Sequence, residues 1–184
     1  YHNLNSNVIF ANIYDSIQIK VLDTNNKNID LKINGRFKKD LSTKPKTNIV
    51  YKAALYFMNK YNIRSDILIT LNKNLPVASG IGGGSADAAA TLRKLLKLFN
   101  INKSIFYRNL HKEIAIKLGS DIPVCLYSSA LNIKNAGEKI SKFPINLKKT
   151  IINNNYIVLI TPNKAMSTEI VFNNWRKKAQ YTNI

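Results

Sequence analysis

Four of the seven glycines of this chain fall within five residues, between a strand-like and a helix-like pattern, and this run constrains the fold most. Residues 75–99 read LPVASGIGGGSADAAATLRKLLKLF. Glycine permits positive φ and lets a ligand reach main-chain N–H groups without meeting a Cβ. Where such a loop enters a helix, its N–H groups and the positive end of the helix dipole face the same space. The run therefore predicts an anion site, above all for phosphate.

Two familiar phosphate loops do not fit the spacing, and a plain connector is a poor alternative. A Walker loop needs a lysine directly after the glycines, and Lys94 comes too late. The dinucleotide fingerprint fails because Ser85 stands where its third glycine belongs. A simple strand-to-helix connector would use Ser85 as the helix N-cap, but each glycine costs about 1 kcal/mol relative to alanine, which a connector does not need.

The N-terminal half alternates between strand and helix periodicity. Apolar and polar residues alternate in 16–21 and 29–33, which predicts two strands joined as a hairpin, with another strand near 8–11. Residues 47–62 have helical spacing, with Thr47 or Asn48 as N-cap.

Beyond residue 62 the same reading continues. A strand is predicted at 66–72, then a helix at 85–99 after the glycine run, and a helix at 105–118 that ends at Gly119. Residues 123–133 are read as extended, and 156–161 as a short apolar strand.

Composition indicates one soluble domain and the start of another. With 184 residues and 45% hydrophobic composition, the chain can bury one good core. The polar stretch 146–155 suggests a boundary, so that 1–150 form one domain and 151–184 begin a second. The chain starts at Tyr1 rather than Met and reads as a piece of a longer protein.

The single cysteine and the absence of a long apolar stretch bear on the compartment. Cys125 can form no intrachain disulfide and is interpreted as a small buried residue. No stretch approaches the roughly 20 apolar residues that cross a bilayer, and no signal peptide is recognised. We therefore expect a cytoplasmic protein with no membrane partner.

The formal net charge of +18 invites a nucleic-acid interpretation. The lysines are scattered singly or in pairs, without a long basic run or interleaved aromatic residues. Lys, Asn and Ile are abundant together, as an AT-rich coding sequence would produce. We favour a solvated basic surface, which would still attract small anions.

Two motifs resemble the GHMP kinases, the superfamily of galactokinase, homoserine kinase, mevalonate kinase and their relatives. PVASGIGGGSADAA at 76–89 looks like their phosphate loop, and LGSDIPV at 118–124 looks like the segment that carries their catalytic aspartate. The spacing of the two motifs also fits. The resemblance implies an α+β fold: a GHMP kinase N-terminal domain, described as a ribosomal-protein-like β/α sandwich, and the start of a ferredoxin-like C-terminal domain.

The resemblance also implies an ATP-dependent kinase that uses Mg²⁺. Asp121 would accept or orient the proton of the substrate hydroxyl, although a turn-forming role is its alternative. Ser85 would face a phosphate or the Mg²⁺ ion. Asn48 and Lys73 would lie near the adenine; a helix N-cap and a solvated lysine are their respective alternatives. The ATP phosphates would be held by the loop residues Pro76, Val77, Ala78, Ser79, Gly80, Ile81, Gly82, Gly83, Gly84, Ser85 and Ala86.

For the substrate, the resemblance implies a cytidine diphosphate sugar alcohol of the non-mevalonate route to isoprenoids. Tyr1 and Phe172 would sandwich the cytosine, while His2 and Thr168 would make polar contacts. Core packing or a frayed terminus is the alternative for these residues. Other GHMP kinase substrates, mevalonate or homoserine, remain open, and so does an RNA-binding module as a different class.

The chain departs from the family pattern in three places. The family's lysine in a P-A-K-[LI]-N segment lies upstream of Tyr1, and its C-terminal glycine-rich segment lies beyond Ile184. The family's G-x-G-E segment is Asn135-Ala136-Gly137-Glu138 here, which leaves the role of Glu138 open. Because Asn tolerates left-handed conformations, the turn is expected to survive. His111 is interpreted as a surface or boundary residue.

Overall fold

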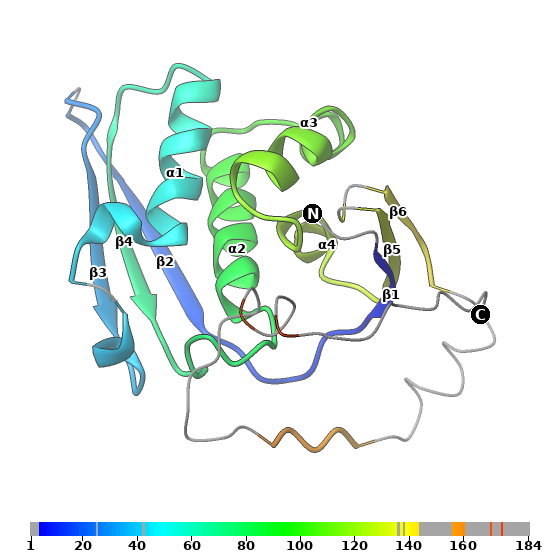
Figure 1. Cartoon of the computed structure of the whole chain (residues 1–184). Coiled ribbons are helices and arrows are strands. Elements are labelled where there is room, and N and C mark those ends of the chain that lie inside the picture. Colours follow the sequence, from blue (N-terminus) through cyan, green and yellow to red (C-terminus); the bar gives the residue numbers. More distant parts are fainter. Residues whose placement is uncertain are drawn as a thin grey trace.

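The computed structural model describes residues 4–24, 26–41, 43–135, 137, 139–143, 156–160, 170 and 174. Within these residues the strands form two three-stranded sheets, with the strand orders β2-β4-β3 and β1-β5-β6. The helices lie between the two sheets and cover one face of the first (Figure 1). The α+β fold expected from the sequence is confirmed, as helices and strands occur together here.

In the first sheet, the most apolar strand takes the central place. β4 (Asp66–Asn72) lies between β2 (Ser16–Leu22), which is antiparallel to it, and β3 (Ile29–Asn34), which is parallel to it. Ile69 pairs with Ile19 on one side and with Leu31 on the other. The predicted hairpin of β2 and β3 is therefore wrong, because the central position goes to the strand with most apolar side chains to bury.

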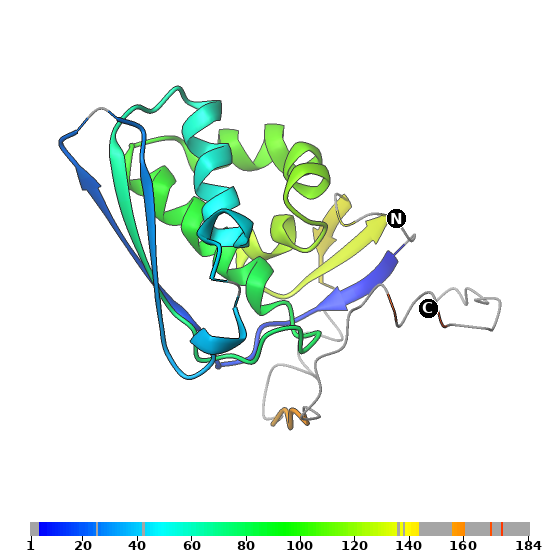
Figure 2. The same ribbon diagram turned by 60° about the vertical axis from the view of Figure 1, so that its left-hand side comes forward.

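The chain connects β3 to its parallel neighbour β4 through the helix α1 (Ile49–Lys60). Two short 3-10 turns, at Lys38–Asp40 and Pro45–Thr47, precede this helix. Parallel strands require such a crossover connection. Asn48 caps α1 by accepting a hydrogen bond from the Val50 N–H at 2.8 Å, as the sequence predicts for one of its two candidates. The whole crossover lies on the same side of the sheet as the other helices (Figure 2).

The core forms where α1 and α2 (Gly83–Leu98) pack on each other and on this sheet. Phe57 of α1 and Leu92 of α2 are completely buried. Phe57 also contacts the ring of Phe106, at 6.2 Å between centroids, which joins α3 (Lys103–Lys117) to the same core. The three predicted helices are thus confirmed, with α2 starting two residues earlier than expected.

The second half of the domain corrects two expectations. Residues 123–133 are not extended throughout, because α4 (Ile122–Tyr127) begins there with Pro123 in its first turn, where proline fits a helix, and only β5 (Leu131–Asn135) is a strand. β5 pairs with β1 (Leu4–Val8) and with β6 (Lys139–Lys142). The first strand therefore lies at 4–8, ahead of the predicted 8–11.

Beyond residue 143 the structure describes only 156–160, 170 and 174. Residues 156–160 form no strand, and Tyr156 is 99% exposed, so the strand predicted there is wrong. An apolar run is a strand only where a partner strand supplies its hydrogen bonds. The predicted boundary at 146–155 and the ferredoxin-like domain lie outside the described residues. Within the described part of the chain, no helix has the length and apolar character needed to span a bilayer.

Candidate active site

The glycine-rich segment forms a loop from the end of β4 to the start of α2. Three of its residues have left-handed backbone conformations: Ala78 at φ 53°, Gly80 at 75° and Gly82 at 73°. Ser79 Oγ donates a hydrogen bond to the Pro76 carbonyl at 2.9 Å and closes a tight turn in the loop. The sequence therefore places glycine at two of the three positions where the backbone must turn left-handed.

Gly82, not Ser85, is the N-cap of α2. Its φ of 73° ends the loop, and no side chain caps the helix. The N-cap role that the connector alternative gives to Ser85 is wrong, because Gly83 and Gly84 already belong to the first turn. The N–H groups of that turn have no intrahelical partner and remain available to an anion. A Cβ built on Gly80 or on Gly82 meets nothing within 4 Å, so both face open space.

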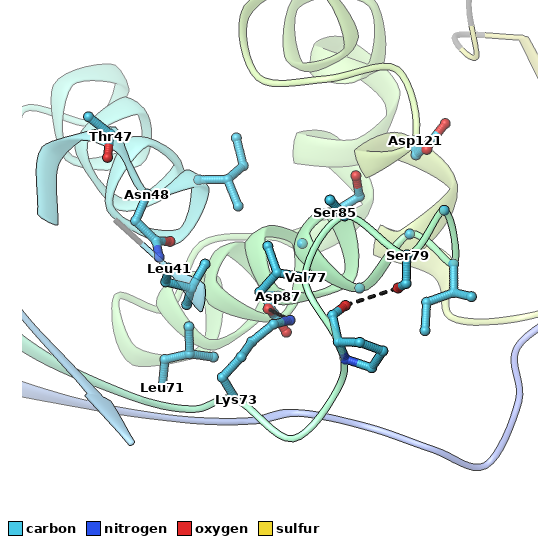
Figure 3. Close-up of a pocket in the computed structure, with 18 residues that line it drawn as sticks. Leu41, Thr47, Asn48, Leu71, Lys73, Val77, Ser79, Ser85, Asp87 and Asp121 are labelled. Carbon is cyan, nitrogen blue, oxygen red and sulfur yellow. Dashed lines mark hydrogen bonds and ion pairs between the residues drawn. The ribbon is translucent and has the colours of Figure 1, made fainter. Parts of the chain in front are cut away.

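A cavity of about 390 Å³ lies over this loop and the start of α2 (Figure 3). One wall comes from the glycine run, and another comes from α1 and the turn before it. Every predicted phosphate-loop residue except Ala86 lines the cavity. Ala86 instead lines an adjoining cavity of about 420 Å³, which shares Gly80–Gly83 and Asp121 with the first.

Asp121 opens onto both cavities, next to the glycine loop. It is exposed and stands at the N-cap position of α4, yet its carboxylate caps no backbone amide of that helix. Its Oδ1 accepts a long hydrogen bond from Ser120 Oγ, at 3.4 Å. The structure therefore brings this carboxylate to the predicted phosphate site and does not use it to cap the helix.

Gly137 supports the turn that carries Asp121. Its φ is 92°, and a Cβ at this position would lie 2.2 Å from the Ser120 carbonyl oxygen. Asn135, two residues earlier, has a φ of 59°, so the left-handed turn expected for asparagine is confirmed. Only a residue without a Cβ allows this close approach.

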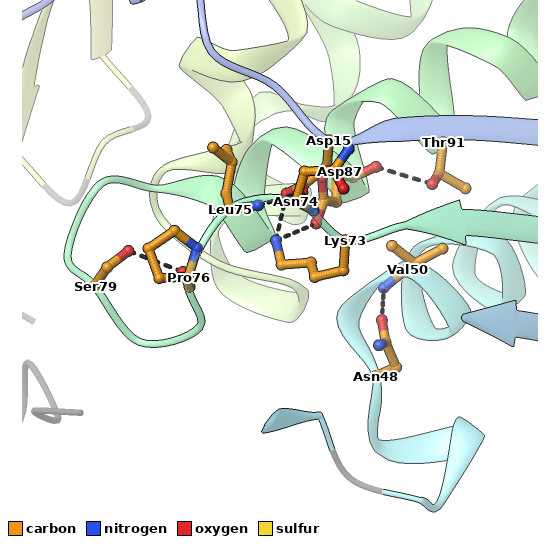
Figure 4. A network of polar contacts seen from close by, with 10 residues as sticks. All are labelled: Asp15, Asn48, Val50, Lys73, Asn74, Leu75, Pro76, Ser79, Asp87 and Thr91. Carbon is orange, nitrogen blue, oxygen red and sulfur yellow. Dashed lines mark hydrogen bonds and ion pairs between the residues drawn. The ribbon is translucent and has the colours of Figure 1, made fainter. Parts of the chain in front are cut away.

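Lys73 and Asn48, the two residues predicted near the adenine, line the cavity together. Lys73 is only 3% exposed, so the alternative of a solvated lysine is wrong. Its ammonium contacts two carboxylates, Asp15 Oδ2 at 2.5 Å and Asp87 Oδ2 at 2.9 Å (Figure 4). Burial lowers the pKa of Lys73, but these carboxylates outweigh burial and raise it.

Neither Asp15 nor Asp87 was predicted from the sequence as a site residue. Burial raises the pKa of Asp87 to about 7, although its contact with Lys73 opposes the shift. Asp87 could have been recognised from the sequence, because it precedes Thr91 and Leu95 at helical spacing and so lies in the buried stripe of α2. A buried carboxylate needs a buried partner. Asp15 could not be recognised in this way, because its partners lie about 60 residues away in the sequence.

Several other sequence expectations are settled or lie outside the described residues. Cys125 is buried, and burial raises the pKa of its thiol to about 12, so the thiol is unreactive as expected. His111 is half-buried and contacts the Tyr127 hydroxyl at 3.0 Å. Across the described ranges, no three His, Cys, Asp or Glu side chains gather as a metal site. Outside the described residues lie Tyr1, His2, Glu138, Thr168 and Phe172.

The site and the fold define a class of protein. Residues 48–129 match the family of the GHMP kinases N terminal domain. This match spans α1, β4, the glycine loop, α2, α3 and α4, and so includes both Asp121 and the loop. The chain therefore contains a GHMP kinase N-terminal domain.

Comparison with curated proteins finds relatives that share one name. The chain is 36% identical over 174 residues to 4-diphosphocytidyl-2-C-methyl-D-erythritol kinase of Clostridium perfringens, an alignment that covers 95% of this chain and 55% of the relative. A kinase of the same name from Clostridium botulinum is 35% identical, with 98% of this chain and 59% of the relative covered. The chain thus spans little more than half the length of the curated relatives it matches.

A solved structure supports the fold. A crystal structure of 4-(cytidine 5'-diphospho)-2C-methyl-D-erythritol kinase aligns with a TM-score of 0.52 and 23% identity, over 70% of this chain and 41% of the other. At this identity the likeness shows the architecture, and the site itself depends on the residues described above.

Proposed function

We propose that this protein is an ATP-dependent kinase that phosphorylates the 2-hydroxyl of 4-diphosphocytidyl-2-C-methyl-D-erythritol, a step in non-mevalonate isoprenoid biosynthesis in the cytoplasm. The relatives that are 35–36% identical over nearly the whole chain carry this name. The observation that carries the proposal is that the glycine loop, the start of α2 and Asp121 line the same cavity of about 390 Å³.

The loop is suited to hold the phosphates of ATP. The N–H groups of the first turn of α2 have no intrahelical partner, and the helix dipole favours negative charge there. Gly80 and Gly82, just before that turn, have open space where a Cβ would project. Phosphoryl transfer asks the protein mainly for positioning and for neutralisation of charge, and preorganised amides supply both. Asn48 and Lys73, on the same cavity, remain our predicted contacts for the nucleotide base.

Asp121 is suited to act on the hydroxyl that attacks the phosphate. Its carboxylate is exposed to the cavity and makes no capping bond that would have to break. As general base it would accept or orient the proton of the substrate hydroxyl, which makes the oxygen a better nucleophile. Its place next to the glycine loop agrees with an attack on the terminal phosphate.

The residues present also suit a magnesium ion that arrives with the nucleotide. Mg²⁺ prefers oxygen ligands and often takes only one or two from the protein, with the rest from phosphates and water. Ser85 and Asp121 bring a hydroxyl and a carboxylate to this cavity. When bound, the ion would neutralise charge on the phosphates.

Steady-state kinetics of the full-length protein test the proposal. ADP release with ATP and 4-diphosphocytidyl-2-C-methyl-D-erythritol should proceed, and Asp121→Asn should lower kcat by about a hundred-fold or more, since general base catalysis contributes that much. Turnover within a few-fold of the wild type would rule out Asp121 as the base. Mevalonate and homoserine serve as comparison substrates, because they are the alternatives within the family.

A further inference from the structure

Asp15 uses both oxygens of its carboxylate to hold the start of the glycine loop. It precedes β2, and its side chain is only 1% exposed. Oδ1 accepts hydrogen bonds from the N–H groups of Asn74 at 2.5 Å and Leu75 at 2.8 Å. Oδ2 accepts from Lys73 Nζ at 2.5 Å. Three successive residues at the end of β4 are thus fixed by one carboxylate (Figure 4).

Lys73 links this carboxylate to α2, at the other end of the loop. Its Nζ donates to Asp87 on α2, and it lies 3.5 Å from the position that a Cβ on Gly83 would take. The ammonium therefore sits directly beneath the first turn of α2. The Lys73 backbone is fixed as well, since its N–H donates to the Asn34 carbonyl at 2.7 Å. One buried cluster, Asp15, Lys73 and Asp87, thus ties both ends of the loop.

The loop between these ends has little support of its own. Gly80 and Gly82 have open space where a Cβ would project, and the turn is closed by the Ser79 to Pro76 hydrogen bond. The position of the loop amides therefore depends on where its two ends are held. Amides bind a phosphate well only if they are positioned before it arrives, because small displacements weaken several hydrogen bonds at once.

We propose that Asp15 is a positioning residue for the nucleotide: by tying Asn74, Leu75 and Lys73 together under α2, it holds the glycine loop in the conformation that binds the phosphates. This inference rests on the proposed function of the loop. Asp15 acts through the loop and through Lys73, and is not itself assigned a contact with the nucleotide.

Asp15→Asn separates this role from simple support of the fold. Asparagine keeps one oxygen for the Asn74 and Leu75 amides, but its NH₂ group replaces the oxygen that accepts from Lys73. In the full-length protein, KM for ATP should rise about ten-fold or more, as expected for loss of a hydrogen bond to a charged group. kcat should change by less than about three-fold, because the loop binds the phosphates before and during transfer.

Asp66→Asn is the matched control. Asp66, at the other end of β4, is also buried and accepts a backbone N–H, that of Asn28 at 2.8 Å, together with the Thr24 hydroxyl at 2.7 Å. Both substitutions should lower the melting temperature, and only Asp15→Asn should raise KM for ATP. An equal rise of that KM in both variants, or no rise in Asp15→Asn, overturns the inference.

Two further measurements keep the test decisive. If Asp15→Asn does not fold, Asp87→Asn breaks the same cluster from α2, and the same selective rise of KM for ATP is expected. Stabilisation of the protein by ADP, measured as a melting-temperature shift, needs no turnover. Wild-type protein that binds ADP without transferring phosphate contradicts the proposed reaction alone, whereas equal ADP affinity in wild type and Asp15→Asn contradicts the positioning role alone.

Discussion

At the scale of single residues, two glycines of the same motif, Gly82 and Gly84, differ in whether the backbone conformation requires glycine. Gly82 has a φ of 73°, which L residues adopt only at a cost. Gly84 lies within the first turn of α2 in ordinary helical conformation, and a Cβ there would make an ordinary contact of 3.7 Å with Ile49. The fold alone therefore requires glycine at 82 and not at 84.

Alanine at these two positions should change stability in opposite directions. Gly82→Ala should lower the free energy of unfolding by about 1–2 kcal/mol through backbone strain. Gly84→Ala should raise it by about 0.5–1 kcal/mol, because alanine is the better helix former. Urea unfolding of both variants measures the difference. A loss of stability in Gly84→Ala would show that the start of α2 differs from the geometry described here.

The hydrogen bonds of Asp66 predict how the stability of the fold depends on pH. The Asn28 N–H and the Thr24 hydroxyl hold the pKa of Asp66 below its ordinary value of 3.8. Its contribution to stability is therefore complete above pH 3.8 and is lost as the pH falls through the lower pKa of the folded state. Melting temperatures from pH 6 to pH 2 should fall more steeply for wild type than for Asp66→Asn. Parallel curves would contradict the role assigned to these hydrogen bonds.

At the scale of helices and strands, local patterns predicted the elements but not their partners. The periodicities of α1, α2 and α3 were sufficient, because a long amphipathic helix carries its own signal. The predicted hairpin of β2 and β3 was wrong, since the alternation of apolar and polar residues does not indicate which strand pairs with which. The short helix α4 was missed because six residues are too few for a period to emerge.

The site shows the same division between local and distant information. The glycine loop and Asp121 could be predicted because each lies in a contiguous motif. Asp15 could not, because its partners Lys73 and Asn74 reach it only after β4 inserts into the sheet. Lys73 was predicted near the adenine, but its burial between two carboxylates was not predicted.

The packing of α2 yields a test at this scale. Leu92 is completely buried where α2 meets α1 and the sheet, while Lys94 is exposed on the same helix. Leu92→Ala should cost about 2–5 kcal/mol of unfolding free energy, as core truncations do. Lys94→Ala should stay within about 0.5 kcal/mol. Similar effects for the two variants in chemical denaturation would contradict the packing of α2.

At the scale of the whole molecule, the net charge of +18 is compatible with the anionic substrates that we propose. ATP and a cytidine diphosphate compound are both drawn toward a basic surface, an attraction that weakens with salt. An RNA-binding module would share that charge but would have no use for a glycine loop facing a cavity with Asp121. The residues predicted to recognise the cytosine lie outside the described part of the chain.

The central claim is that the amides at the start of α2 hold the phosphates of ATP beside Asp121. A crystal structure of the full-length protein with a non-hydrolysable ATP analogue tests it most directly. We predict phosphate oxygens about 3 Å from main-chain nitrogens of residues 80–85, with the terminal phosphate on the side of the Asp121 carboxylate. An analogue bound with its phosphates away from this loop, or with Asp121 at its far end, would contradict it.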